Sequence, residues 1–274
     1  MIVDAHFHAW RPARGDYGWL TPALVPLYRD VEVADWLHEA VPCGVAGGVL
    51  VQAAPTEAET AFLLGQAARQ PAVLGVVGWV DLLADDAPAR IARLAAVPKL
   101  KGLRPMLQDL DDPDWILQPR IAPALAAMAA HGLVFDALVR PVHLPRVRVL
   151  CARHPGLRVV IDHGAKPDIG AGQWEPWAGE MAALARETGA TCKLSGLLTE
   201  AGPHPAPDAA TRWARHLLEV FGAQRLLWGS DWPVLELAAT YRDWWAAVQG
   251  LLAACRDEDR AAVLGANARR VYRL

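Results

Sequence analysis

Cysteine is scarce in this sequence, and its spacing excludes two classes of protein. Only 4 of the 274 residues are cysteines, and no two of them form a C-x-x-C pair. A disulfide-rich secreted domain or a cysteine-based zinc site needs paired, closely spaced cysteines. We therefore expect free thiols and a cytoplasmic location.

The chain also lacks long apolar runs, an excess of either charge and a visible targeting segment. No stretch approaches the roughly 18 consecutive apolar residues that a membrane-spanning helix requires. A formal net charge of -3, from 27 Lys and Arg against 30 Asp and Glu, gives no electrostatic case for nucleic acid or an anionic membrane. Asp4, His6 and His8 stand where a signal peptide would carry basic and then apolar residues, so none is expected.

Apolar sequence is abundant, but it comes in short runs. Hydrophobic residues make up 53% of the chain and charged residues 21%, which is typical of a globular protein with a large core. The expected strands are rich in Val, Ile, Leu and Gly, and they cover residues 2–8, 45–52, 73–80, 99–105, 133–138, 157–162, 190–194 and 225–230. Segments with helical periodicity lie at 33–40, 57–70, 88–95, 120–131, 144–152, 177–188, 209–221 and 237–253.

This alternation predicts an α/β fold, a single (β/α)8 TIM barrel over residues 1–274. Apolar runs of about five to eight residues without polar alternation suit parallel strands that are buried on both faces. A repeat of roughly 30 residues matches the strand-helix unit of such a barrel. An open doubly wound sheet is the alternative, but it would normally begin with a glycine-rich phosphate turn. Asp4-Ala5-His6-Phe7-His8 stands there instead.

Ionisable side chains end three of the expected strands, where barrel enzymes place their catalytic groups. His6 and His8 lie two apart on the first strand, so both point to the same face, where they can bind a metal or hold substrate and water. His163 and Lys166 follow the sixth strand, and Asp231 follows the eighth. Burial of such groups is costly unless something uses them. The alternatives are histidines that bond backbone carbonyls and ordinary capped turns.

Polar residues end other strands as well. Arg104, after the fourth strand, is a permanent planar cation that can grip a carboxylate or polarise a carbonyl, or can pair with an aspartate of the following loop. Gln52 and Asp136, in the second and fifth strands, are expected to face the same pocket. The only lysines of the chain all lie in or beside expected strands, and they are Lys99, Lys101, Lys166 and Lys193.

Several familiar catalytic motifs are absent. The chain has no G-x-S-x-G, no phosphate-binding P-loop and no H-E-x-x-H. Ser195 follows the seventh strand, but no nearby residue is an obvious base, so a serine hydrolase is not expected. Two irregular segments, 10–28 and 164–176, are expected to be loops that wall the catalytic face.

The motifs at the strand ends occur in a specific order. Asp4-Ala5-His6-Phe7-His8 opens the chain, Lys101-Gly102-Leu103-Arg104 and Asp162-His163 follow, and Gly229-Ser230-Asp231-Trp232-Pro233-Val234 comes after the eighth strand. Together they resemble the amidohydrolase superfamily, and more closely its branch of sugar lactonases, which includes L-fuconolactonase and 2-pyrone-4,6-dicarboxylate lactonase relatives. The resemblance implies a barrel that opens a cyclic ester, a sugar-acid lactone, with water. The small-molecule lactone is then the one partner expected, and a homo-oligomer is left open.

The resemblance also implies roles for individual residues. Asp231 would be the general base that takes a proton from the attacking water, while His163 and Arg104 would stabilise the oxyanion. The residues implied to bind the substrate are His6, His8, Gln52 and Lys166.

A metal site is implied at the same positions. The residues of one mononuclear site would be His6, His8, His163 and Asp231, with zinc the preferred divalent ion. Phe135-Asp136-Ala137 stands where the superfamily has a further histidine, so a binuclear centre is not expected. Members of the lactonase branch are thought to work without a metal, which leaves open either no cofactor or one divalent ion. The rival functions are a metal-dependent decarboxylase or amide hydrolase of the same superfamily and a barrel that only binds a sugar acid.

Overall fold

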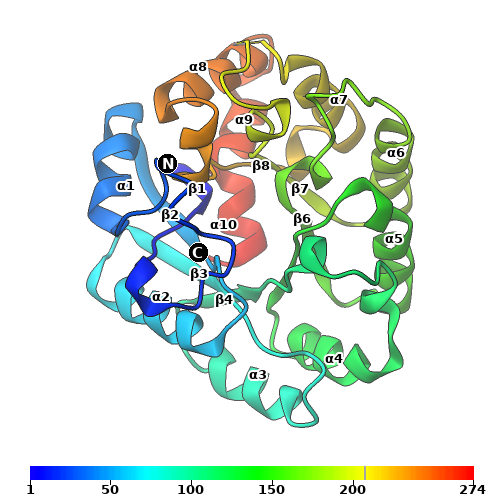
Figure 1. Cartoon of the computed structure of the whole chain (residues 1–274). Coiled ribbons are helices and arrows are strands. Elements are labelled where there is room, and N and C mark those ends of the chain that lie inside the picture. The colour runs from blue at the N-terminus through cyan, green and yellow to red at the C-terminus, as the bar shows by residue number, and fades with distance from the viewer. Residues whose placement is uncertain (207) are drawn as a thin grey trace.

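The structure, a computed structural model, describes residues 1–206 and 208–274. Eight parallel strands form one sheet in the order β1 to β8, and Figure 1 shows helices arranged around them. The strands are β1 Ile2–Phe7, β2 Val45–Val51, β3 Val73–Gly78, β4 Leu100–Leu103, β5 Val134–Ala137, β6 Arg158–Ile161, β7 Thr191–Leu194 and β8 Leu226–Trp228. The helices are α1 Val33–Ala40, α2 Glu57–Arg69, α3 Ala87–Ala95, α4 Ala122–Ala130, α5 Leu144–Arg153, α6 Trp177–Glu187, α7 Thr211–Phe221, α8 Tyr241–Leu252, α9 Asp257–Ala261 and α10 Asn267–Tyr272.

The predicted (β/α)8 barrel is confirmed, and the segment after β8 closes it. Phe7 of β1 forms a parallel bridge with Trp232, and the His8 N–H donates to the Trp232 carbonyl at 2.8 Å. The predicted strands are all present but shorter, so residues expected at strand ends lie just beyond the strands. Arg104 follows β4 in this way. Helices α9 and α10 were not predicted.

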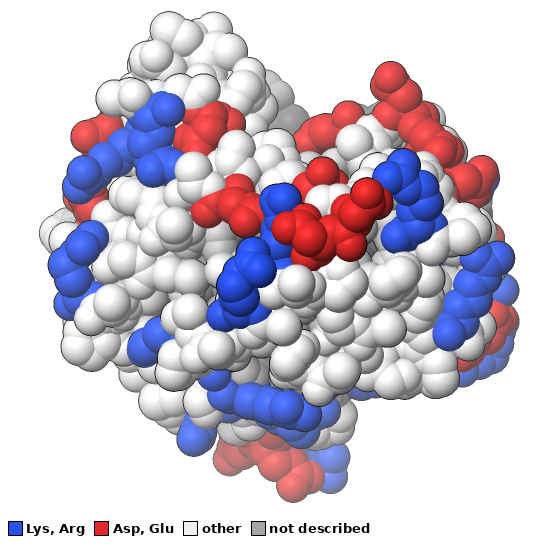
Figure 2. Space-filling model, turned by 90° about the horizontal axis from the view of Figure 1, so that it is seen from below, with Lys and Arg blue, Asp and Glu red and all other residues white. Residues whose placement is uncertain are grey.

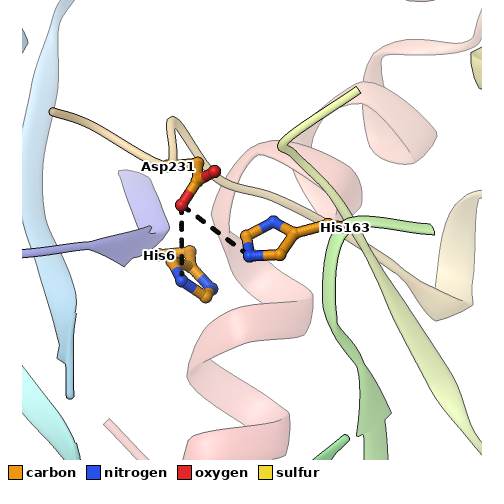
Figure 3. Close-up of side chains that lie close together, drawn as sticks. All are labelled: His6, His163 and Asp231. Atoms are coloured by element: carbon orange, nitrogen blue, oxygen red, sulfur yellow. Dashed lines mark ion pairs between the residues drawn. The ribbon is translucent and has the colours of Figure 1, made fainter. Parts of the chain in front are cut away.

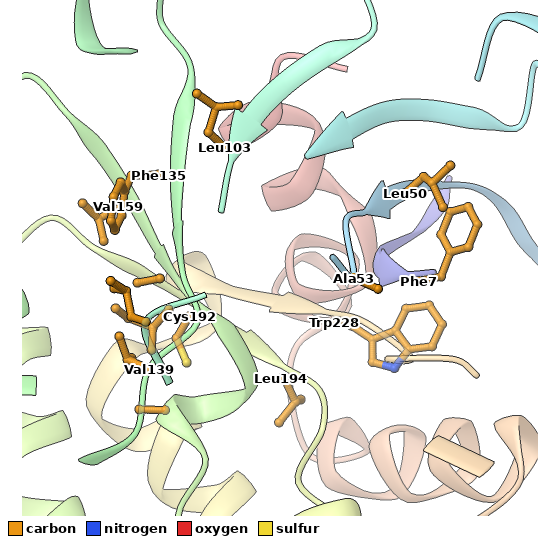
Figure 4. Close-up of a cluster of buried hydrophobic side chains, with 14 of the residues drawn as sticks. Phe7, Leu50, Ala53, Leu103, Phe135, Val139, Val159, Cys192, Leu194 and Trp228 are labelled. Carbon is orange, nitrogen blue, oxygen red and sulfur yellow. The ribbon is translucent and has the colours of Figure 1, made fainter. Parts of the chain in front are cut away.

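Apolar side chains pack in two layers, one on each side of the sheet. The outer layer lies between strands and helices, and Figure 4 shows part of it, including Phe7, Leu50 and Trp228. The inner layer combines strand residues with residues of α10. The strand residues are Val3, Ala5, Val49, Val51, Val77, Val134, Val160 and Leu227, and those of α10 are Ala268, Val271 and Tyr272. Arg158, the first residue of β6, donates to the Val271 carbonyl at 2.7 Å. Helix α10 therefore lies against the amino end of the barrel.

An interruption in β1 decides which of its polar residues enter the barrel. The pairing of β1 with β2 shifts register twice. The Asp4 carboxylate faces the surrounding helices, where it accepts hydrogen bonds from Trp36 Nε1 and Tyr241 OH, each at 3.0 Å. His6 and His8 lie against each other at the end of the strand, with their Nε2 atoms 3.2 Å apart. Although the three residues are each two apart, only the histidines reach the site.

The surface carries both charge signs. Lys and Arg side chains lie among Asp and Glu on the face shown in Figure 2, as the balanced composition predicts. Within the described residues, no helix combines the length and the apolar character needed to span a bilayer.

Candidate active site

Polar side chains from four strands converge at the carboxyl end of the barrel. They are His6 in β1, His8 just beyond it, Arg104 beyond β4, Asp162 and His163 beyond β6, and Asp231 beyond β8. All six are buried. Figure 3 shows His6 and His163 both facing one oxygen of the Asp231 carboxylate. Of the residues that the sequence analysis expected in one pocket, His6, His8, Arg104, His163 and Asp231 therefore lie together.

The turn after β8 holds Asp231 in a left-handed conformation, with φ 58°. This conformation is uncommon for residues other than glycine and costs about 1–3 kcal/mol. The Asp231 N–H donates to the His6 carbonyl at 2.8 Å. Ser230 donates to both Asp4 carboxylate oxygens, through its N–H at 2.8 Å and its hydroxyl at 2.6 Å. These bonds tie the turn to β1 and offset the backbone cost.

Imidazoles surround one oxygen of the Asp231 carboxylate. Asp231 Oδ1 lies 3.2 Å from His8 Nε2 and 3.7 Å from the Nε2 atoms of His6 and His163. Burial alone would raise the pKa of Asp231, but the His163 and His8 rings outweigh burial and hold this pKa below its ordinary value. The carboxylate is therefore ionised at neutral pH, and it can accept a proton or ligate a cation.

The partners of the ring nitrogens fix the tautomer of His6 and the orientation of His8. Lys193 Nζ donates to His6 Nδ1 at 3.1 Å, which places the His6 proton on Nε2, opposite His8 Nε2. His8 Nδ1–H donates to the Val51 carbonyl at 2.8 Å, and its Nε2 lies 3.2 Å from both His6 Nε2 and Asp231 Oδ1. Burial and then the Lys193 charge hold the pKa of His6 well below its ordinary value. His6 is therefore neutral.

His163 is positioned by a left-handed turn and by the neighbouring strand. Residues 163–166 all have positive φ, which turns the ring into the barrel mouth. His163 Nδ1 lies 2.9 Å from Ser195 Oγ, beyond β7, and its Nε2 faces Asp231. A Cβ on Gly196, which has φ +64°, would lie 2.5 Å from His163 Nδ1, so glycine is required there. Burial lowers the pKa of His163 to about 4.

The contact between His163 and Ser195 corrects one expectation from the sequence. No base was expected near Ser195, yet an imidazole nitrogen lies within hydrogen-bond distance of its hydroxyl. The sequence analysis missed the pair because the histidine follows β6 and the serine follows β7, and only the parallel sheet brings their ends together.

Arg104 is clamped by Gln52 and Asp162. Arg104 Nη2 donates to the Gln52 carbonyl and to Gln52 Oε1, and Gln52 Nε2 donates back to the Arg104 carbonyl at 2.9 Å. Arg104 Nη1 lies 3.2 Å from Asp162 Oδ2 and 3.4 Å from His6 Nε2. The ion-pair partner of Arg104 is thus an aspartate across the barrel rather than one in the following loop. Gln52, expected to contact substrate, uses its amide to hold Arg104.

A buried charge network lies on the other side of His6. Lys193 Nζ is 2.5 Å from Asp136 Oδ2 and 2.9 Å from Asp162 Oδ1, and all three side chains are fully buried. Tyr272 OH donates to the Asp136 carboxylate at 2.9 Å. Burial would raise the pKa of Asp162, but Lys193 outweighs it and holds this pKa well below its ordinary value. Asp136, expected to face the pocket, pairs with Lys193. The one feature of the sequence that indicates this network is Lys193, a lysine inside an apolar strand.

A hollow of about 170 Å³ opens beside these groups. Its lining residues are His8, Trp19, Ala53, Arg104, Met106, Gln108, Asp109, Leu138, His163, Lys166, Asp231 and Val234. Trp19 comes from the 10–28 loop and Lys166 from the 164–176 loop, so both segments wall the hollow. Lys166 Nζ pairs with Glu200 at 3.1 Å. The hollow suits a small ring placed against Asp231.

His6, His163 and Asp231 fit a single divalent cation. Their ligand atoms all lie within 4.8 Å of one another. Two imidazoles and a carboxylate form a donor set that zinc accepts. The lowered pKa values of both histidines keep them in the neutral, ligating form, and a cation at His6 Nε2 would replace the proton there. His8, the fourth expected ligand, lies outside this group and is held by the Val51 carbonyl.

Comparison with known proteins gives three consistent results. The amidohydrolase family profile matches residues 3–274. Two L-fucono-1,5-lactonases align with nearly the whole chain: that of Burkholderia ambifaria is 47% identical over 99% of this chain and 95% of that protein, and that of Burkholderia multivorans is 36% identical over 100% and 96%. The crystal structure of a Burkholderia multivorans amidohydrolase with bound zinc superposes with a TM-score of 0.91 at 34% identity, covering 100% of this chain and 99% of that one.

Proposed function

This chain belongs to the amidohydrolase family, and from that membership we propose that it is a lactonase, a hydrolase that opens the ring of a sugar-acid lactone with water. Two full-length relatives that carry the name L-fucono-1,5-lactonase support a substrate of that type. They favour lactone hydrolysis over a decarboxylase, an amide hydrolase or a barrel that only binds. The observation that carries the proposal is the ionised Asp231 carboxylate beside Arg104 and three imidazoles in a small hollow.

In the first step, Asp231 accepts a proton from a water molecule as the water oxygen attacks the lactone carbonyl carbon. The low pKa of Asp231 makes it a weak base. A lactone tolerates a weak base because its ester carbonyl is more electrophilic than an amide carbonyl. The carbonyl oxygen then carries a negative charge in the tetrahedral intermediate.

Arg104 and His163 stabilise that oxyanion. The Arg104 guanidinium is held rigidly by Gln52 and Asp162, so it needs no reorganisation during the reaction. When the Ser195 hydroxyl donates to His163 Nδ1, the His163 proton resides on Nε2. That nitrogen faces Asp231, so it can donate to an oxyanion that forms beside Asp231.

In the second step, the bond between the carbonyl carbon and the ring oxygen breaks. The proton that Asp231 received from water passes to the departing ring oxygen, which becomes the free hydroxyl of a hydroxy acid. Asp231 returns to its ionised form. No atom is left over, because one water molecule has been added across the ester bond.

His6, His163 and Asp231 would hold a divalent cation, with zinc the preferred ion. When bound, the cation would polarise the lactone carbonyl and lower the pKa of a water molecule. The zinc-bound relative supports this assignment. The groups that position substrate beside such an ion remain His8, Arg104 and Lys166.

The test is acid release from a panel of sugar-acid lactones, beginning with L-fucono-1,5-lactone and followed with a pH indicator. Asp231→Asn should lower kcat by about 10²–10⁴-fold, the usual contribution of a general base. Asp85→Asn is the matched control, because the Asp85 side chain is fully exposed, and it should leave the rate unchanged. Acid release by Asp231→Asn at the wild-type rate would exclude Asp231 as the base, and absence of acid from every lactone would refute the function.

A further inference from the structure

A second cavity adjoins the catalytic hollow, and we call it the side cavity. It measures about 510 Å³, against about 170 Å³ for the hollow. Trp19, Met106 and Asp109 line both spaces, so the two adjoin each other. Ligand sites usually enclose about 300–1,000 Å³. The hollow alone therefore suits one small ring, and the side cavity has room for a further unit of the same molecule.

Indole rings supply much of the side-cavity wall. Trp19, Trp79 and Trp115 come from three separate segments of the chain. Trp19 Nε1 donates to the Ala53 carbonyl at 2.7 Å, and the Trp79 N–H donates to Thr60 Oγ1 at 2.8 Å. The first bond fixes the Trp19 indole before a ligand arrives, which reduces the entropy lost on binding, and the second, made by the backbone N–H, fixes the main chain at Trp79.

Carboxylates supply the polar part of the wall. Asp16, Asp81 and Asp109 line the side cavity, and its described lining residues include neither lysine nor arginine. Asp81 accepts a hydrogen bond from the Leu83 N–H at 3.0 Å, and Asp109 accepts one from Gln108 Nε2 at 3.1 Å. A carboxylate offers about four acceptor positions, so both retain capacity for ligand hydroxyls.

We propose that the side cavity is a subsite for a neutral sugar unit linked to the lactone, so that the enzyme accepts aldobionolactones, which are lactones carrying a second, uncharged pyranose. The proposal rests on the lactonase function proposed above. The electron-rich indole faces attract the C–H groups on one face of a pyranose. Asp81 and Asp109 accept its hydroxyls, whereas they repel a uronic acid, and a purely apolar group would desolvate them without replacing their hydrogen bonds.

The experiment compares two substrate classes in three proteins. We would measure kcat/KM for L-fucono-1,5-lactone and for a set of neutral aldobiono-1,5-lactones that differ in linkage, with the wild type, Trp115→Ala and Asp81→Asn. Trp115 and Asp81 line the side cavity but not the catalytic hollow. Each variant should lower kcat/KM for the best aldobionolactone roughly 10-fold and leave that for the monosaccharide lactone unchanged. Asp81→Asn keeps the side-chain shape, so it serves even where Trp115→Ala fails to fold.

The outcomes separate the subsite from the lactonase function. Opening of monosaccharide lactones without any opening of aldobionolactones overturns the subsite and leaves the lactonase function standing. An equal loss on both substrate classes in Asp81→Asn also overturns it, since the cavity would then support the fold or the catalytic hollow. If no lactone of either class is opened, the lactonase function fails and the subsite fails with it.

Discussion

Replacement of Lys193 by methionine tests the buried charge network most directly. Lys193 Nζ contacts Asp136 Oδ2 at 2.5 Å and Asp162 Oδ1 at 2.9 Å, and the side chains are completely buried. Methionine retains most of the volume but leaves two carboxylates without their shared cation. Arg104 still faces Asp162 and Tyr272 still donates to Asp136, so the loss should correspond to one broken buried pair. We expect the free energy of unfolding to fall by about 3–5 kcal/mol.

Urea unfolding of the wild type and Lys193→Met at pH 7 measures this loss. Lys101→Met is the matched control, because Lys101 Nζ bonds only the exposed Arg273 carbonyl among its described partners, and it should cost under about 1 kcal/mol. A loss of about 3–5 kcal/mol is a large share of the about 5–15 kcal/mol typical of folded proteins. Adding Asp136→Asn to Lys193→Met should recover part of the loss, because one of the unpaired charges is removed.

The pH dependence of the free energy of unfolding gives a second test of the same network. In the wild type, the pKa of Asp162 is well below its ordinary value, so its stabilising contribution is present above pH 4 and is lost as pH falls through the folded-state pKa. Without Lys193, both carboxylates should take up protons more readily in the folded state. The stability difference between wild type and variant should therefore shrink as pH falls from 7 toward 4.5. A difference below about 1 kcal/mol at pH 7, or one that does not change with pH, would refute the network.

Three further predictions concern His163. Its folded-state pKa of about 4 lies below the ordinary 6.5, so between these pH values the unfolded chain binds a proton that the folded chain does not. Thermal unfolding should therefore show that stability falls as the pH drops from 6.5 to 4. A stability that does not change over this range would contradict a buried, neutral His163 ring. Gly196→Ala should lower kcat at least about 10-fold, since its Cβ would displace the His163 ring, and an unchanged kcat would show that the ring position does not matter. Ser195→Ala should lower the free energy of unfolding in urea by about 1–3 kcal/mol, because it leaves a buried ring nitrogen of His163 without its partner. The same substitution should lower kcat by a larger factor than it raises KM. A raised KM with an unchanged kcat would instead place Ser195 at the substrate.

The parts of the site that follow from local pattern could be predicted. His6, His163 and Asp231 stand at or just beyond the ends of apolar strands, and parallel strands buried on both faces bring their carboxyl ends to one place. The order of the motifs then made the amidohydrolase resemblance specific, which the comparisons confirm. The barrel itself follows from the same repeated pattern of apolar run and helix.

Contacts between distant strands could not be predicted. Arg104 pairs with Asp162 across the barrel, because strand register and the clamp by Gln52 decide where its guanidinium points. The inward lysine of β7 and the outward Asp4 likewise depend on which face each residue takes, and a register shift in β1 breaks the simple alternation. Helix α10 carries no motif that reveals its place inside the barrel end.

The position of α10 limits how substrate and product reach and leave the active site. Val271 and Tyr272 pack among the inner residues of the sheet, so the barrel floor is sealed by the chain's own last helix. Substrate and product must then enter and leave through the same opening, beside the loops that include Trp19 and Lys166. The hydroxy acid product carries a carboxylate close to Arg104, and it has to dissociate before another lactone can bind. The rate of product release therefore sets an upper limit on kcat.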